Sequence, residues 1–167
     1  MKIGVGSYWQ LEETVREFRP HAVISIVDQS RLVPKLNIGP QDHFGIGFHD
    51  IEQPEQGKTE PSREHIEKLI EFAAGRSRAG AKRFLIHCGA GVRRSPAAAF
   101  IVSILVRQDD PVRAAHVLFE AAPFADPNML MIKHADTLGG YSGEAIRAVE
   151  AARGSKPQAK QQHFFCI

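Results

Sequence analysis

One short segment of the chain joins a cysteine, an arginine and a serine at a spacing that suits phosphate chemistry. The segment reads His87-Cys88-Gly89-Ala90-Gly91-Val92-Arg93-Arg94-Ser95. Small residues in it let backbone amides approach an anion closely. A cysteine at the start of such a loop is expected to be held as a thiolate, because those donors favour the charged form. Arg94 offers a planar fork of donors that matches two phosphate oxygens. We therefore expect a nucleophile that cleaves phosphate esters.

The residues on either side of this segment predict how it is held. Arg83-Phe84-Leu85-Ile86 is typical of a buried strand, and the apolar run 96–102 is typical of a buried helix. A strand, a tight loop and a helix N-terminus form an anion-binding site, to which the helix dipole adds partial positive charge. The loop lacks the Gly-Lys-Ser/Thr ending of a nucleotide-binding P-loop, which argues against an NTPase.

The segment resembles the signature loop of the cysteine-dependent protein-tyrosine phosphatase superfamily, His-Cys-x5-Arg-Ser/Thr, and the short chain looks most like its compact dual-specificity-type branch, in a bacterial version. The resemblance implies that Cys88 attacks phosphorus and forms a phosphocysteine. It implies that the phosphate is bound by the loop residues, namely Gly89, Ala90, Gly91, Val92, Arg93 and Arg94. It also implies that Ser95 helps the sulfur to leave and that His87 orients the loop. From its position alone, the Ser95 hydroxyl could equally cap the helix.

The leaving oxygen needs a proton, which a carboxylic acid on a neighbouring loop can supply. We expect Asp50 to be this acid, because it directly follows the predicted strand 44–48. The resemblance implies the same residue, since Asp50 precedes Cys88 by one helix and one strand, the order in which compact family members place their acid. A loop aspartate that caps its own backbone is the alternative. The rival acids are Asp28 and Asp42, both interpreted as turn residues, with Glu52 and Glu55 in reserve.

Arg93 departs from the family pattern, in which many relatives carry Gly or Ser. Two interpretations stay open. Its cation could add positive potential at the rim and favour strongly anionic substrates. Alternatively, it could be a solvated side chain that points away from the loop.

Strands alternate with helices along the rest of the chain. Strands are expected at 2–6, 22–27, 44–48 and 83–87, and helix starts at Ser7, Ser62, Asp110, Asn128 and Ser142. This order predicts an α/β fold: a mostly parallel central sheet of four to five strands flanked by helices on both faces, with a helical C-terminal third, like that of a protein-tyrosine phosphatase. One phosphatase domain is expected at 1–153, followed by a disordered tail at 154–167.

Composition narrows the function classes. A net charge of +2 is too small to argue for nucleic acid. No apolar run approaches the length of a membrane span, and the N-terminus has no apolar segment typical of a signal peptide. The two cysteines, Cys88 and Cys166, form no disulfide framework, and a working thiolate favours the cytoplasm. The histidines lack zinc-ligand spacing, and we expect neither a metal nor a cofactor.

The predicted function is a metal-independent phosphomonoesterase that acts on phosphotyrosine, and on phosphoserine or phosphothreonine, in a phosphorylated protein or another phosphomonoester. A phosphoinositide phosphatase is the first alternative, although relatives with that activity often carry lysines where Gly89 and Val92 stand. A catalytically silent phosphate-binding module is the second. A sulfurtransferase of the rhodanese type also uses a loop cysteine, and the Arg-Ser ending argues against it.

Overall fold

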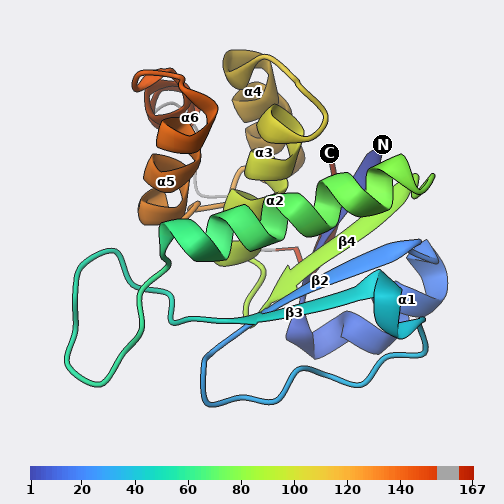
Figure 1. The fold of residues 1–167 in the computed structure, drawn as a ribbon. Coiled ribbons are helices and arrows are strands. Elements are labelled where there is room, and N and C mark those ends of the chain that lie inside the picture. Colours follow the sequence, from blue (N-terminus) through green and yellow to red (C-terminus); the bar gives the residue numbers. More distant parts are fainter. Residues whose placement is uncertain (154–161) are drawn as a thin grey trace.

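The fold is built on a five-stranded sheet (Figure 1). The structure is a computed structural model, and it describes residues 1–153 and 162–167. The strands lie in the order β3-β2-β4-β1-β5. Their bounds are β1 Lys2–Ser7, β2 Ala22–Val27, β3 His43–Gly47, β4 Arg83–Cys88 and β5 Phe164–Cys166. The first four are parallel, and β5 runs antiparallel to β1. The predicted mostly parallel α/β sheet is confirmed.

The helices cover the two faces of the sheet unequally. Their bounds are α1 Leu11–Phe18, α2 Arg63–Arg78, α3 Arg94–Leu105, α4 Pro111–Ala121, α5 Met129–Gly139 and α6 Glu144–Arg153. Helices α2 to α6 pack over one face, whereas α1 lies on the other (Figure 1). The large core lies under α2 to α6, and a small apolar cluster of Leu11, Val23 and Leu85 lies under α1. A single eight-residue helix cannot cover a whole sheet face, so part of this face stays accessible.

Helix α3 fixes the loop that contains the predicted nucleophile. Every residue of α3 from Arg94 to Ile104 is buried, so its N-terminus is held rigidly by packing on all sides. Strand β4 lies between β1 and β2 and ends at Cys88. A buried strand and a buried helix therefore hold the loop at both ends.

Side-chain caps explain where several helices begin. Ser62 accepts a hydrogen bond from the backbone N–H of His65, Asp110 from that of Arg113 and Asn128 from that of Met131. These three starts match the sequence prediction. The prediction for Ser7 is wrong, since its side chain makes no capping bond and a 3-10 turn, Tyr8–Gln10, precedes α1. Ser142 lies two residues before α6 begins.

The end of the chain departs from the expected disordered tail. Phe164, Phe165 and Cys166 pair with Gly6, Val5 and Gly4 of β1. Phe165 is buried and lies edge-on to Phe124, which explains why these apolar residues form a strand. The prediction is therefore wrong for residues 164–166, and its residues 154–161 lie outside the described part of the chain. None of the described helices is long and apolar enough to cross a bilayer.

Candidate active site

The Cys88 sulfur lies inside the loop that joins β4 to α3. Its Sγ accepts a hydrogen bond from the backbone N–H of Gly91 at 3.3 Å and lies 3.2 Å from the hydroxyl oxygen of Ser95. Gly91 has a φ of 77°, and a Cβ there would lie 3.1 Å from the carbonyl oxygen of Gly6. Only glycine fits both the positive φ and the close approach to β1. The loop therefore curls its amide towards the sulfur.

Arg94 reaches into the same place from the first turn of α3. Its Nη1 donates to a carboxylate oxygen of Asp28 at 2.9 Å and to the carbonyl oxygen of Phe48 at 2.7 Å. Its Nε is buried and has no hydrogen-bond partner among the described residues. A Cβ on Gly89 would lie 3.8 Å from Nη2 of Arg94. The guanidinium is thus oriented by two acceptors on one side and lies beside the loop on the other.

A pocket of about 300 Å³ opens over Cys88 and Arg94; we call it the Cys88 pocket. Its wall includes Asp28 and Arg31, from the loop that follows β2. Two largely exposed apolar side chains also line it: Leu32, which is 93% exposed, and Tyr8, which is 47% exposed. The pocket therefore combines a polar floor with an apolar rim.

Asp50 belongs to a separate group of charges, which we call the Arg93 cluster: Arg93 with Asp50, Glu52 and Asp126. Arg93 donates from Nε to Asp50 at 3.2 Å, from Nη2 to Glu52 at 2.5 Å and from Nη1 to Asp126 at 2.6 Å. The side-chain amide of Asn128 donates to the same oxygen of Asp50 at 2.9 Å. The cluster fastens the loop after β3 to the loop before α5.

His87 is fully buried behind the loop. Its Nε2 lies 2.6 Å from the hydroxyl oxygen of Ser25, which in turn lies 2.7 Å from Nε2 of His43. Burial lowers the pKa of His87 to about 4, against a smaller raising effect of the Cys88 backbone. Burial also lowers the pKa of His43. A neutral His87 that is hydrogen-bonded across β2 and β4 supports the loop from below, as expected for a structural residue.

Solved structures resemble this arrangement over most of the chain. The PTP-2 phosphatase of Cydia pomonella has a TM-score of 0.66 and 21% identity, with 81% of this chain and 84% of that chain covered. Human DUSP28 has a TM-score of 0.64 and 17% identity, over 84% and 92%. The human tyrosine phosphatase-like serine/threonine/tyrosine-interacting protein has the same TM-score, identity and coverage. No protein-family model and no curated protein matches the sequence.

The chain has the protein-tyrosine phosphatase fold, in its compact dual-specificity form. Sequence identities this low show a shared fold alone, and they do not show which chemistry the site performs. Within this fold, the loop 88–94 occupies the carboxyl edge of the sheet, where the strand ends near Val27, Gly47 and Cys88 meet.

The phosphatase fold places several predicted residues differently from the sequence interpretation. Ser95 lies within α3 and contacts the sulfur, whereas Arg93 occupies the N-cap position without a side-chain cap, so the predicted capping role of Ser95 is wrong. Arg93 does not point away from the loop as a free side chain, and it is not a source of free positive potential, because three carboxylates pair with it. Of the rival acids, Asp42 pairs with Arg76 and Glu55 with Lys58.

Sequence reasoning missed the role of three residues around the Cys88 pocket. Asp28, interpreted as a turn residue, orients Arg94 and lines the pocket. Tyr8 reaches the pocket from the 3-10 turn after β1, and Ser25 supports His87 from β2. Position at the carboxyl end of a strand was the available signal for Asp28. For Ser25, the signal was a lone hydroxyl in the apolar run 22–27.

Proposed function

We propose that the chain is a phosphomonoesterase that works through a phosphocysteine on Cys88. The single observation that carries the proposal is the Cys88 sulfur, which contacts the Gly91 amide and the Ser95 hydroxyl beside the oriented guanidinium of Arg94. Donors that surround a sulfur favour its anionic form and also match the oxygens of a phosphate in transfer. A buried, inert cysteine would need none of these partners.

In the proposed reaction, the Cys88 sulfur forms a bond to phosphorus while the bond from phosphorus to the ester oxygen breaks. The leaving oxygen takes its proton from a carboxylic acid. Water then attacks phosphorus, the acid's conjugate base takes the water proton, and the thiolate leaves as phosphate is released. Arg94 and the loop amides bind the phosphoryl oxygens throughout, and Ser95 donates to the departing sulfur.

We assign the acid role to Asp50. Two contacts support the assignment. The carbonyl of Phe48, two residues earlier, accepts a hydrogen bond from Arg94, and Asp50 itself contacts Arg93 of the loop. Asp28 is the matched comparison, since it lines the pocket and is paired with Arg94, whereas Asp50 is paired with Arg93. Asp50→Asn should lower kcat strongly with little change in KM, whereas Asp28→Asn should mainly raise KM by disturbing Arg94.

For the substrate, we propose phosphotyrosine first, with phosphoserine and phosphothreonine as slower substrates. The apolar rim of Tyr8 and Leu32 supports an aryl group at the mouth of the Cys88 pocket. A reducing compartment, such as the cytoplasm, suits an enzyme that depends on a thiolate.

The test is turnover of an aryl phosphate in the presence of a chelator. Wild type should turn over, and Cys88→Ser and Arg94→Lys should each lose about a thousandfold or more. His116→Gln, a change at an exposed position of α4, serves as the control. Activity that survives in Cys88→Ser would refute the mechanism. Tight phosphopeptide binding without hydrolysis by wild type would instead favour a silent phosphate-binding module.

A further inference from the structure

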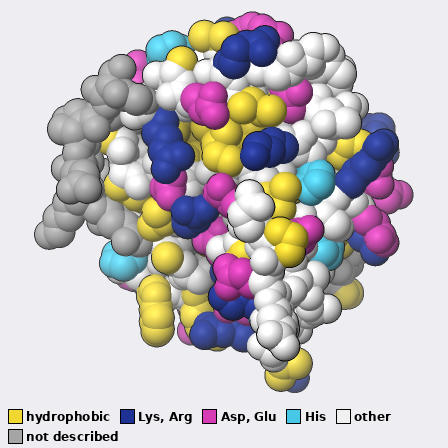
Figure 2. Space-filling model, turned by 90° about the vertical axis from the view of Figure 1, so that its left-hand side faces the viewer, with side chains coloured by type: hydrophobic (Ala, Val, Ile, Leu, Met, Phe, Trp, Pro, Cys, Tyr) yellow, Lys and Arg dark blue, Asp and Glu magenta, His cyan; other side chains and the backbone are white. Residues whose placement is uncertain are grey.

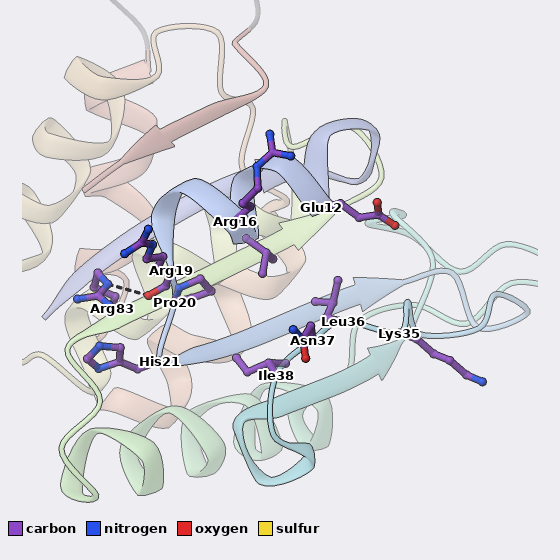
Figure 3. Close-up of a pocket in the computed structure, with 11 residues that line it drawn as sticks. Glu12, Arg16, Arg19, Pro20, His21, Lys35, Leu36, Asn37, Ile38 and Arg83 are labelled. Atoms are coloured by element: carbon purple, nitrogen blue, oxygen red, sulfur yellow. Dashed lines mark hydrogen bonds between the residues drawn. The ribbon is translucent and has the colours of Figure 1, made fainter.

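A second hollow lies at the opposite end of the sheet from the Cys88 pocket. It has a volume of about 740 Å³ and lies between α1 and the segment 35–38 (Figure 3). His21 and Arg83, which line it, stand at the amino ends of β2 and β4, whereas Cys88 ends β4 at the carboxyl edge. We call this hollow the α1 groove.

The rim of the α1 groove is basic. Arg16, Arg19, Lys35 and Arg83 line it, against the single carboxylate of Glu12. In the described part of the chain, no carboxylate pairs with Arg19, Lys35 or Arg83. The Nε of Arg83 donates to the backbone carbonyl oxygen of Arg19 at 2.8 Å, which fixes the Arg83 side chain against the end of α1 (Figure 3). The rim therefore carries positive charge that the fold leaves unneutralised.

This imbalance is local. On the face shown in Figure 2, which includes the long loop between β3 and α2, Lys and Arg side chains stand among Asp and Glu side chains. The net charge of the whole chain is only +2. Arg16 is paired with Glu13 at 3.6 Å, which leaves three cations unpaired within the described residues, against the carboxylate of Glu12 in a single groove. This excess favours a negatively charged partner.

The floor of the α1 groove is apolar. Val15 from α1 and Leu36 and Ile38 from the crossing segment line it, and these three pack on the small cluster under α1. Pro20, which follows α1 in the chain, also lines the groove. A partner that fills the groove must therefore offer apolar side chains as well as carboxylates. A peptide segment has both, whereas a membrane surface or a nucleic-acid backbone would contact only the basic rim.

The groove is continuous with the Cys88 pocket along α1. A third hollow, of about 400 Å³, shares Tyr8 with the pocket and shares Glu12, Arg16, Lys35 and Leu36 with the groove. Six-residue β2 spans the distance between the two ends, or roughly 20 Å at ~3.3 Å per residue. An extended peptide covers that distance in about six residues.

We infer that the α1 groove docks an acidic segment of a phosphoprotein substrate, about five to eight residues from the phosphorylated side chain in the Cys88 pocket. This inference rests on the proposed function. The carboxylates of the segment contact Arg19 and Lys35, and its apolar side chains pack on Leu36 and Ile38. The groove thus selects among substrates that share the same phosphorylated residue.

The test compares two phosphotyrosine peptides that differ only in a distal tail, one with Asp, Glu and Leu and the other with Ser and Gly. The acidic tail should raise kcat/KM by about five- to thirtyfold, mainly through KM, and the gain should shrink with salt. The double variant Arg19→Glu/Lys35→Glu should abolish the gain while keeping turnover of a small aryl phosphate within about twofold. Arg113→Glu, an exposed charge reversal on α4, is the matched control and should keep the gain.

Equal kcat/KM for the two peptides, with normal turnover of the small aryl phosphate, would overturn docking and leave the proposed function intact. If the protein turns over no phosphate ester, the proposed function fails, and binding of a fluorescent unphosphorylated acidic peptide to the full chain still tests the groove. Binding that the double variant loses and Arg113→Glu keeps supports docking. Binding of phosphatidylserine vesicles or an oligonucleotide in place of the peptide, lost in the same double variant, would overturn it.

Discussion

Replacing Arg93 by methionine tests whether the Arg93 cluster holds the loop that carries Asp50. Methionine keeps much of the stem and removes the charge. The change deletes three charge-assisted hydrogen bonds, to Asp50, Glu52 and Asp126, and leaves these carboxylates facing one another. The four side chains are 28% to 34% exposed, so solvent screens each pair only in part.

The magnitude follows from these contacts. At about 0.5–1 kcal/mol for each of the three partly screened pairs, Arg93→Met should lower the free energy of unfolding by about 1.5–3 kcal/mol. For a chain of this size, that corresponds to a fall in Tm of about 3–12 °C. Asn128 still holds Asp50, so kcat should fall by about tenfold rather than vanish.

Arg153→Met is the matched control, because Arg153 contacts only Asp126 of the cluster and is 46% exposed. It should cost less than about 1 kcal/mol and leave kcat unchanged. Thermal unfolding and steady-state turnover of an aryl phosphate measure both effects. Equal stability and equal kcat in the two variants would refute the idea that Arg93 holds the Asp50 loop.

Three further changes test other parts of the site. His87 binds its proton more weakly in the folded state, with a pKa of about 4 against about 6.5 in the unfolded state. The free energy of unfolding should therefore fall by about 3 kcal/mol as pH drops from 6.5 to 4. In urea titrations, His87→Gln should reduce this dependence of the unfolding free energy on pH. Ser95→Ala removes the hydroxyl beside the sulfur, so kcat should fall about ten- to hundredfold while the initial burst of released phenol persists in stopped-flow traces. Gly91→Ala places a Cβ against the Gly6 carbonyl at a positive φ and should cost about 1–3 kcal/mol in thermal unfolding, with loss of turnover.

Each of these expectations has a clear contrary result. The His87 account fails if His87→Gln keeps the full acid-dependent slope, which would assign the slope to the partly buried histidines, His43 and His65. If Ser95→Ala loses the initial burst of phenol together with kcat, the Ser95 hydroxyl acts in the formation of the phosphocysteine and not in its hydrolysis. A Gly91→Ala variant as stable and active as wild type would show that the loop needs no left-handed residue there.

The sequence predicted the parts of the fold that depend on local pattern. The apolar run 22–27 and the run before Cys88 form the central strands. A strand that is apolar on both faces is buried when helices cover both sides of a parallel sheet. The side-chain caps at Ser62, Asp110 and Asn128 were also predictable, because a capping side chain bonds only to the backbone of the first helical turn that follows it. The tail strand was not, because β5 forms through partners 160 residues away, on β1.

The site shows the same division. Cys88, Gly91 and Ser95 lie within one short segment of the chain, from the end of β4 to the first turn of α3, so their spacing alone predicted that they meet. The partners of Arg93 and Arg94 come from loops that tertiary structure brings together. Nothing local to Arg93 indicates three carboxylates from distant positions. The position of Asp28 at the carboxyl end of β2 places it near the site, but it does not indicate that Asp28 pairs with Arg94.

Trapping the covalent intermediate tests the central claim most directly. Wild-type protein is mixed with an aryl phosphate, quenched in acid within milliseconds and digested for mass spectrometry. We expect a phosphoryl group on the peptide that contains Cys88, more of it in Ser95→Ala, and none in Cys88→Ala, which should also lose turnover. Steady turnover by wild type without any phosphoryl group on Cys88, or turnover that persists in Cys88→Ala, would contradict the account.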